Sequence, residues 1–315
     1  MDHLLQVLSL PTPVQRSKFL SRSGYEVYVK RDDLIHPHIS GNKYRKLKYN
    51  LIEAVDRGAL VLITYGGAFS NHLVAVAAAG YHLGLRTVGI VRGYKLDDAN
   101  PTLAILRSYN MEIHLVEPKE YADKEKSAKV AAIVSGYEAS YIIPEGGTNE
   151  LALRGVAEGL LEIDDLTSYD TIIVALGTGG TVAGVCQAIE KMKTKVIGVS
   201  PFRGDRGVYK GLDYMTSSQR AKLEIVQSAI DVKFGGYHPD LVRTINHMQS
   251  IDAIEIDPVY MSKAVYTLDK MIDGQNFERQ SRILLLHSGG LQGAKGYENQ
   301  YAHLIERDRD ILSCT

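Results

Sequence analysis

Hydrophobic residues in this chain recur in short blocks, each followed by a glycine-rich turn and then by a longer segment rich in Ala, Val and Leu. The pattern is clearest in ALVLITYGGAFSNHLVAVAAAGYHLGL (59–85) and in DTIIVALGTGGTVAGVCQAIEKM (170–192). A short apolar run bounded by glycines predicts a buried strand, and a longer apolar segment predicts a helix. Both stretches are therefore predicted to be strand–turn–helix units.

The same alternation continues along the rest of the chain. Further strands are predicted at 86–93, 111–117, 195–202 and 282–290, and amphipathic helices at 120–137, 217–230 and 259–272. Alternating strands and helices of these lengths predict an α/β protein with parallel sheets covered by helices on both faces. Ligands of such sheets bind beyond the carboxyl ends of the strands, where the glycine-rich turns fall.

The recurrence of the strand–turn–helix unit near residues 60 and 170 predicts two sheet domains that meet at a cleft. The Gly- and Pro-containing segment IIPEGGTNELALRG (142–155) is the predicted crossing point between them. We assign residues 1–45 and 152–315 to a large domain and residues 46–151 to a small one.

Composition narrows the class of protein. The chain has 315 residues, 36 Lys plus Arg against 37 Asp plus Glu, a net charge of -1 and 45% hydrophobic residues, which are ordinary values for an enzyme-sized globular chain. A nucleic-acid-binding protein would show a basic surplus, and no apolar run is long enough to cross a bilayer. The start of the chain does not resemble a signal peptide, and Cys186 and Cys314 form no disulfide framework, so a cytoplasmic location is expected.

Positive charge is nevertheless concentrated at one place, SGNKYRKLKYNL (40–51), with three lysines and an arginine. In a nearly neutral protein, a local anion is the expected partner. Lys43 and Lys46 are three residues apart and share one face of a helix, whereas Arg45 and Lys48 are predicted to be solvated. A cation is unfavourable at a helix start, and Lys43 would escape this penalty if its amine were consumed in a Schiff base.

Two glycine-rich turns could bind anions. In LGTGGT (176–181), backbone amides and threonine hydroxyls at a helix start suit a monophosphate. A dinucleotide-binding fingerprint would need glycine at position 182, where this chain has Val182. The alternative to an anion site is a glycine turn that serves only to pack the strand against the helix. In YGGAFSNH (65–72), Ser70 could cap the helix or seat a substrate carboxylate, but the Gly-x-Ser-x-Gly pattern of a hydrolase nucleophile is missing. No metal site is predicted.

Five segments together resemble a known family. They are KRDDLIHPHISGNKYRKLKYNL (30–51), TYGGAFSNHLVAVAAAGYHLG (64–84), LGTGGTVAGV (176–185), DPVYMSKAVY (257–266) and LLLHSGGLQG (284–293). In this order they are similar to the D-cysteine desulfhydrase and 1-aminocyclopropane-1-carboxylate (ACC) deaminase family. The resemblance spans about residues 10–300 and implies a two-domain, tryptophan synthase β-like fold (fold type II), with pyridoxal 5'-phosphate as cofactor and the active site in the interdomain cleft. A homodimer is expected on the same ground.

The resemblance also implies residue roles. Lys43 would bond covalently to the cofactor, Asn71 would bond its phenolic oxygen, and Ser70 would hold the substrate carboxylate or assist proton transfer. Tyr260 corresponds to the family's active-site tyrosine. The residues implied in phosphate binding are Lys46, Gly177, Thr178, Gly179, Gly180 and Thr181.

Two positions separate the subfamilies. ACC deaminases carry Glu after the active-site tyrosine and Leu after the last strand's His, where this chain has Met261 and Ser288. A Ser288 hydroxyl at the pyridine nitrogen, in place of a carboxylate, resembles the desulfhydrase pattern and favours loss of a β-leaving group. We therefore expect D-cysteine to be converted to pyruvate, ammonia and sulfide, with Lys43 removing the α-proton and Tyr260 protonating the leaving group.

Three alternatives stay open from the sequence. ACC deamination to α-ketobutyrate and ammonia is the first, and racemisation of an amino acid by the same lysine chemistry is the second. The third is a non-enzymatic two-domain protein that binds a small phosphorylated ligand and gives Lys43 no special role.

Overall fold

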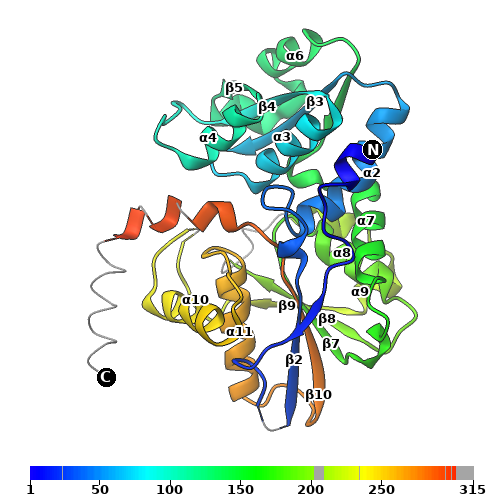
Figure 1. Cartoon of the computed structure of the whole chain (residues 1–315), viewed down its shortest axis with the longest axis vertical. Coiled ribbons are helices and arrows are strands. Elements are labelled where there is room, and N and C mark those ends of the chain that lie inside the picture. Colours follow the sequence, from blue (N-terminus) through cyan, green and yellow to red (C-terminus); the bar gives the residue numbers. More distant parts are fainter. Residues whose placement is uncertain (23, 202–208, 234, 295, 299, 303–315) are drawn as a thin grey trace.

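The computed structural model describes residues 1–22, 24–201, 209–233, 235–294, 296–298 and 300–302. These residues form two sheets, one above the other in Figure 1, with helices packed around each. The predicted architecture of two sheets built from strand–turn–helix units is thereby confirmed.

The larger sheet has the strand order β1-β2-β10-β7-β8-β9, and all of its neighbours are parallel except the pair β1 and β2. Its strands are β1 (Val14–Arg16), β2 (Tyr25–Lys30), β7 (Thr171–Ala175), β8 (Lys195–Ser200), β9 (Leu223–Gln227) and β10 (Ser281–Leu286). The smaller sheet is entirely parallel, in the order β5-β4-β3-β6. Its strands are β3 (Val61–Gly67), β4 (Arg86–Arg92), β5 (Glu112–Val116) and β6 (Ser140–Ile143).

Eleven α-helices accompany the sheets in the described part of the chain. They are α1 (Asp2–Leu5), α2 (Asn42–Asp56), α3 (Asn71–Leu83), α4 (Pro101–Ser108), α5 (Pro118–Asp123), α6 (Ala128–Ser135), α7 (Glu150–Leu160), α8 (Gly180–Ala188), α9 (Ser217–Arg220), α10 (Pro239–Asp252) and α11 (Met261–Asp273). No helix among these described residues is both long and apolar enough to cross a membrane.

Each sheet buries both of its faces, as its uninterrupted apolar strands require. In β7, Ile172 and Val174 belong to one core with residues of α8, whereas Ile173 and Ala175 belong to a second core with residues of α11. Side chains of a strand alternate between the two faces of a sheet, so α8 and α11 cover opposite faces.

Helix α2 lies between the two sheets and crosses α7 at very short range. A Cβ atom on Gly155 of α7 would lie 2.0 Å from the backbone oxygen of Arg45, and one on Gly159 would lie 2.5 Å from the Arg45 Cδ. Only glycine allows this approach, because any larger residue would push the two helices apart. The glycines of α7 thus fix the position of α2.

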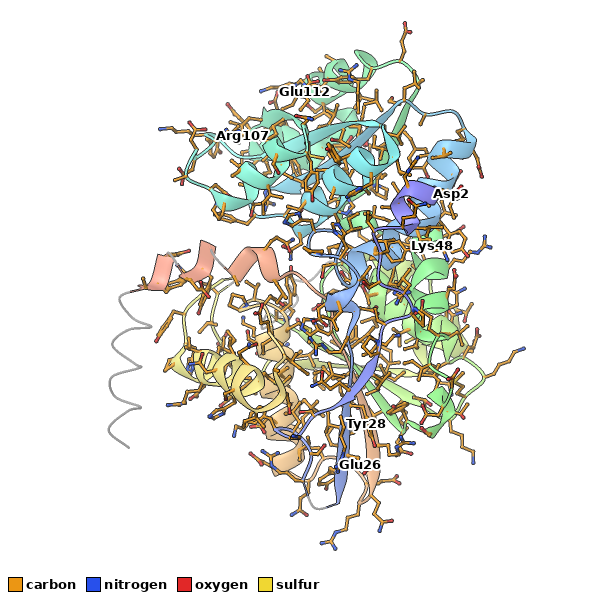
Figure 2. The ribbon with its side chains drawn as sticks, viewed as in Figure 1. Asp2, Glu26, Tyr28, Lys48, Arg107 and Glu112 are labelled. Carbon is orange, nitrogen blue, oxygen red and sulfur yellow. The ribbon has the colours of Figure 1, made fainter. Side chains whose placement is uncertain are left out.

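Arg45 itself is buried, which corrects the prediction that it is solvated. Its guanidinium lies 2.9 Å from an Asp32 carboxylate oxygen and 2.5 Å from one of Glu162. Thr12 donates a hydrogen bond to Asp32 from the other side, at 2.6 Å. Lys48 lies on the outer side of α2 and pairs with the half-exposed Glu158 (Figure 2).

Two predicted helices are wrong in extent. The segment 217–230 is helical only in α9 and then forms the edge strand β9 beside β8. The segment 120–137 is divided into α5 and α6, because Lys124 adopts a positive φ of 50° that an α-helix does not allow. The predicted domain boundaries fall inside α2 and α7, and the division into two domains stays a prediction.

We expect Arg45→Met to lower the free energy of unfolding by about 3 kcal/mol, because it leaves the Asp32 and Glu162 carboxylates without their cation. Chemical denaturation followed by circular dichroism measures this change. The matched control is Arg57→Met, at the end of the same helix, where the arginine is exposed and pairs with Glu53. That variant should lose well under about 1 kcal/mol, and equal losses in the two variants would contradict the anchoring role of Arg45.

Candidate active site

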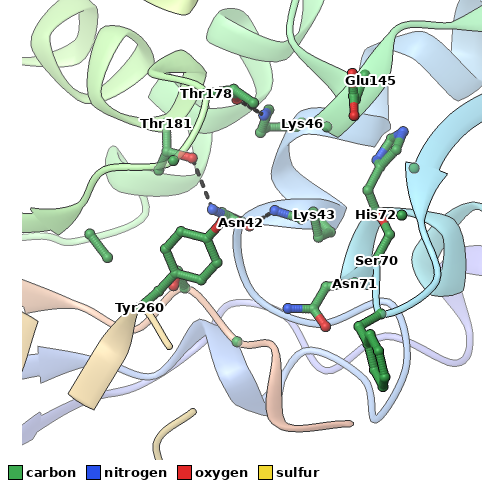
Figure 3. Close-up of a pocket in the computed structure, with 18 of the residues that line it drawn as sticks. Asn42, Lys43, Lys46, Ser70, Asn71, His72, Glu145, Thr178, Thr181 and Tyr260 are labelled. Atoms are coloured by element: carbon green, nitrogen blue, oxygen red, sulfur yellow. Dashed lines mark hydrogen bonds between the residues drawn. The ribbon is translucent and has the colours of Figure 1, made fainter. Parts of the chain in front are cut away.

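A cavity of about 410 Å³ lies where the carboxyl ends of strands from both sheets face α2 (Figure 3). All of the predicted site residues except Gly180 line it. The lining residues are Asn42, Lys43, Lys46, Gly66, Gly67, Ala68, Phe69, Ser70, Asn71, His72, Arg92, Glu145, Gly146, Ala175, Gly177, Thr178, Gly179, Thr181, Val182, Asp257, Tyr260, Ser288 and Gly289.

Lys43 projects into this cavity from the first turn of α2. Its Nζ atom donates a hydrogen bond to Asn42 Oδ1 at 2.9 Å, and Asn42 Nδ2 in turn donates to Thr181 Oγ1 at 3.0 Å (Figure 3). Burial lowers the pKa of Lys43 to about 8, against the opposing effect of the Asp257 carboxylate. A substantial fraction of the amine is therefore neutral near pH 8, as a nucleophile or base requires.

Lys46 lies one turn further along the same face, as predicted, and is only 2% exposed. Its Nζ atom donates to Thr148 Oγ1 at 2.7 Å and to Thr178 Oγ1 at 3.3 Å. Burial, and then the charge of Lys43, hold the pKa of Lys46 well below its usual value. No carboxylate of the described residues pairs with it, so an anion brought into the cavity would restore its charge.

The glycine-rich turn faces Lys46 at the N-terminus of α8. Gly179 precedes this helix with a φ of 88°, and a Cβ atom on Gly211 would lie 2.2 Å from the backbone nitrogen of Gly180. Gly180 itself packs beside the Lys46 side chain, since a Cβ atom there would lie 3.2 Å from Lys46 Cε. Free backbone amides, threonine hydroxyls and a buried lysine are the donor set of a phosphate site.

Ser70 and Asn71 begin helix α3 on the opposite wall. Ser70 Oγ accepts a hydrogen bond from the Leu73 backbone nitrogen at 3.3 Å, so the capping role that the sequence left open is present. Gln292 Nε2 donates to Asn71 Oδ1 at 2.7 Å, which leaves the Asn71 amide hydrogens directed elsewhere. His72 is buried, and burial followed by the charges of Lys43 and Lys46 keeps its pKa well below the usual value.

Tyr260 reaches the cavity from the residue preceding α11. Burial, and then the neighbouring Asp257 carboxylate, raise the pKa of Tyr260 to about 12, so its phenol stays protonated at neutral pH. Asp257 is 3% exposed and accepts hydrogen bonds from the backbone nitrogens of residues 259–261 at 2.8 to 2.9 Å. These bonds fix the start of α11 and with it the position of Tyr260.

Ser288 lines the cavity, and Met261 lies behind it in contact with its backbone. The Ser288 backbone nitrogen donates to the Met261 thioether sulfur at 3.4 Å, and Met261 is fully buried. The Ser288 carbonyl oxygen accepts from the Asn42 backbone nitrogen at 3.2 Å, and a Cβ atom on Gly41 would lie 2.1 Å from that oxygen. The backbone at Ser288 thus sets the start of α2.

Sequence reasoning missed several lining residues. Asp257 stands in the same motif as Tyr260, and Asn42 is adjacent to Lys43, so the sequence could have indicated that both line the site. For Arg92 and Glu145 the indication was weaker, because each lies at or just beyond the carboxyl end of a strand. No group of three or more His, Cys, Asp or Glu residues close enough to hold a metal ion is present in the described part of the chain.

Comparison with known proteins agrees with this geometry. Residues 7–289 match the profile of the pyridoxal-phosphate dependent enzyme family. A Thermotoga maritima protein named for ACC deaminase activity is 35% identical over 90% of this chain and 95% of its own length. The bifunctional D-cysteine desulfhydrase/ACC deaminase of Arabidopsis thaliana mitochondria is 31% identical over 96% of this chain and 82% of its own length.

A solved structure described as an ACC deaminase homologue superimposes with a TM-score of 0.80 at 27% identity, covering 96% of this chain and 95% of its own. The tryptophan synthase β-like fold and the enzymatic class expected from the sequence are confirmed, and the non-enzymatic alternative is wrong. The protein therefore belongs to the pyridoxal-phosphate dependent enzymes, in the family that contains the ACC deaminases and D-cysteine desulfhydrases.

Proposed function

We propose that the protein catalyses pyridoxal-phosphate-dependent β-elimination from a small amino acid, with D-cysteine as a substrate that yields pyruvate, ammonia and sulfide. The observation that carries this proposal is the pair Met261 and Ser288. Ser288 lines the cavity, the buried Met261 packs against its backbone nitrogen, and neither residue carries a carboxylate.

Electron withdrawal by the cofactor depends on the group beside its pyridine nitrogen. A carboxylate there favours the protonated ring, whereas a hydroxyl leaves it neutral. The Ser288 side chain lines the cavity and makes no hydrogen bond to any described residue. A weaker electron sink is sufficient where a thiolate departs readily, and it suits opening of a cyclopropane ring poorly.

The residues present fit the cofactor. Lys46 with the turn 177–181 would hold its phosphate, Asn71 its phenolic oxygen and Ser288 its ring nitrogen. Bound there, pyridoxal phosphate supplies an electron-accepting ring conjugated to the substrate's α-carbon. Ser70 and the N-terminus of α3 would orient the substrate carboxylate, because exposed amides and a hydroxyl favour an anion.

Two side chains would move protons. The Lys43 amine, with its pKa lowered to about 8, is suited to take the α-proton once it is free. The Tyr260 phenol, with its pKa raised to about 12, keeps its proton for the departing sulfur. Burial thus assigns opposite roles to the two groups.

ACC deamination is the second candidate. The support for it lies in the relatives, since the Thermotoga maritima protein is named for this activity and the Arabidopsis thaliana protein for both. The two reactions share the binding residues, so the products distinguish them.

The purified protein with pyridoxal phosphate should release sulfide and pyruvate from D-cysteine in equal amounts, and little α-ketobutyrate from ACC. Colorimetric sulfide detection and chromatography of the keto acids measure both. Release of α-ketobutyrate from ACC without sulfide from D-cysteine would contradict the proposal and favour deamination. Interconversion of enantiomers without any keto acid would favour racemisation.

Tyr260→Phe should lower kcat/KM for D-cysteine by on the order of a hundredfold or more, because the leaving sulfur loses its proton donor. The visible absorption of the bound cofactor should change little. Tyr266→Phe, two turns along α11 with its hydroxyl near Asp240, is the matched control and should retain activity. Full elimination activity in Tyr260→Phe would rule out the proton-donor role.

A further inference from the structure

Arg92 places a guanidinium group at the cavity, and the proposed reaction assigns no role to this group. It is the last residue of β4, and its Cα pairs with that of Gly67, the last residue of β3, three residues before Ser70. It lines the cavity, and among the described residues it forms neither a hydrogen bond nor an ion pair. Its one contact of note is with Tyr121, whose ring centroid lies 5.7 Å from the Arg92 Cζ.

The two carboxylates that line the cavity have other partners. Asp257 accepts hydrogen bonds from the backbone nitrogens of residues 259–261, at the start of α11. Glu145 accepts from the Tyr121 hydroxyl at 2.7 Å and from Lys124 Nζ at 2.8 Å. Although burial opposes it, these donors and the charge of Arg92 keep the pKa of Glu145 below its usual range, so Glu145 remains an anion matched by Lys124.

Positive charge is therefore in excess around Arg92. Lys124 Nζ lies 3.3 Å from the Tyr121 ring centroid, so the same tyrosine contacts both Lys124 and Arg92. Lys210 begins the short 3-10 helix before α9. Burial lowers the pKa of Lys124, and the charges of Lys210 and Arg92 lower it further, against the effect of Glu145. The charges of Lys210 and Arg92 thus both act on Lys124, whose ion-pair partner in the described part of the chain is Glu145.

The simpler alternative is that Arg92 is an ordinary solvated surface arginine. Arg86, at the other end of β4, is an example of such a residue. Arg86 is largely exposed and pairs at 3.6 Å with Glu112. Glu112 lies on the edge strand β5 and is labelled in Figure 2. Arg92 is also exposed, but unlike Arg86 it lines the cavity and forms no ion pair with any described residue.

The anions already assigned to the cavity do not account for Arg92. The cofactor phosphate is assigned to Lys46 and the turn 177–181, and the substrate's α-carboxylate to the N-terminus of α3. A further anion would have to come from the substrate's side chain. Guanidinium groups bind carboxylate, sulfate and phosphate oxygens through paired hydrogen bonds, which makes Arg92 suited to this group.

We propose that Arg92 determines substrate specificity and that the preferred substrates are β-substituted amino acids whose side chain carries an anionic group. This inference rests on the proposed elimination and specifies its substrate class. In such a reaction the Cα–H bond and the bond from Cβ to the substituent break, the Cα=Cβ bond forms, and the substituent leaves with the bonding electrons. Water then converts the enamine product to pyruvate and ammonium.

The test compares serine O-sulfate with O-acetylserine, each in both enantiomers, through pyruvate release by the holoenzyme. Arg92→Gln should lower the ratio of kcat/KM for the sulfate to kcat/KM for the acetate by about tenfold, mainly through KM. The different reactivities of the two leaving groups cancel when variants are compared. Arg92→Lys should retain most of the ratio, and Arg86→Gln should retain all of it.

A binding measurement separates this inference from the proposed function. Aspartate and alanine lack a β-leaving group, and their dissociation constants follow from the absorbance change of the holoenzyme. Arg92→Gln should raise the dissociation constant of aspartate by about tenfold and leave that of alanine unchanged. Unchanged ratios in both measurements would overturn the role of Arg92. If no β-substituted amino acid released pyruvate, the elimination would be wrong, and the binding ratio alone would decide the role of Arg92.

Discussion

The buried ion pairs of Arg45 with Asp32 and Glu162 determine where the two cavity lysines lie. Arg45 anchors one face of α2 to the segment before that helix and to the residues that follow α7. Gly155 and Gly159 bring α7 against the same face at a distance that excludes any side chain. Lys43 and Lys46, on the opposite face, can then point only into the cavity, so a structural arginine between two functional lysines sets their direction.

This anchoring also explains how the protein tolerates two lysines in one buried site. Desolvation disfavours a buried ammonium, and the charge of Lys43 further disfavours that of Lys46. Around Lys46, hydroxyl groups take the place of carboxylates, which leaves the site ready for a phosphate. Around Lys43, the Asp257 charge offsets burial only in part, so the amine loses its proton readily.

Local sequence patterns predicted the strand–turn–helix units and the two-sheet architecture. The family resemblance supplied the site residues, and all of them except Gly180 line the cavity. These features depend on short stretches, such as the turn 177–181, whose geometry is set by neighbouring residues. The burial of Arg45 could not be predicted, because Glu162 is distant in sequence and only the packing of α7 reveals the contact. Likewise, the β9 segment resembles a helix in composition, and pairing with the edge of β8 decides its conformation. Arg92 and Glu145 line the same cavity only because the parallel strands β4 and β6 end at the same edge of their sheet. The roles of the site residues and the homodimer stay predictions.

The most direct test of this account is to identify the residue that carries the cofactor. The yellow holoenzyme should be reduced with borohydride, digested, and its peptides analysed by mass spectrometry. The account predicts a pyridoxyl adduct on Lys43 alone, with Lys46 unmodified although it lies one turn away on the same face. An adduct on Lys46, or a protein that stays colourless with added pyridoxal phosphate, would contradict the arrangement of the two lysines from which the proposed chemistry follows.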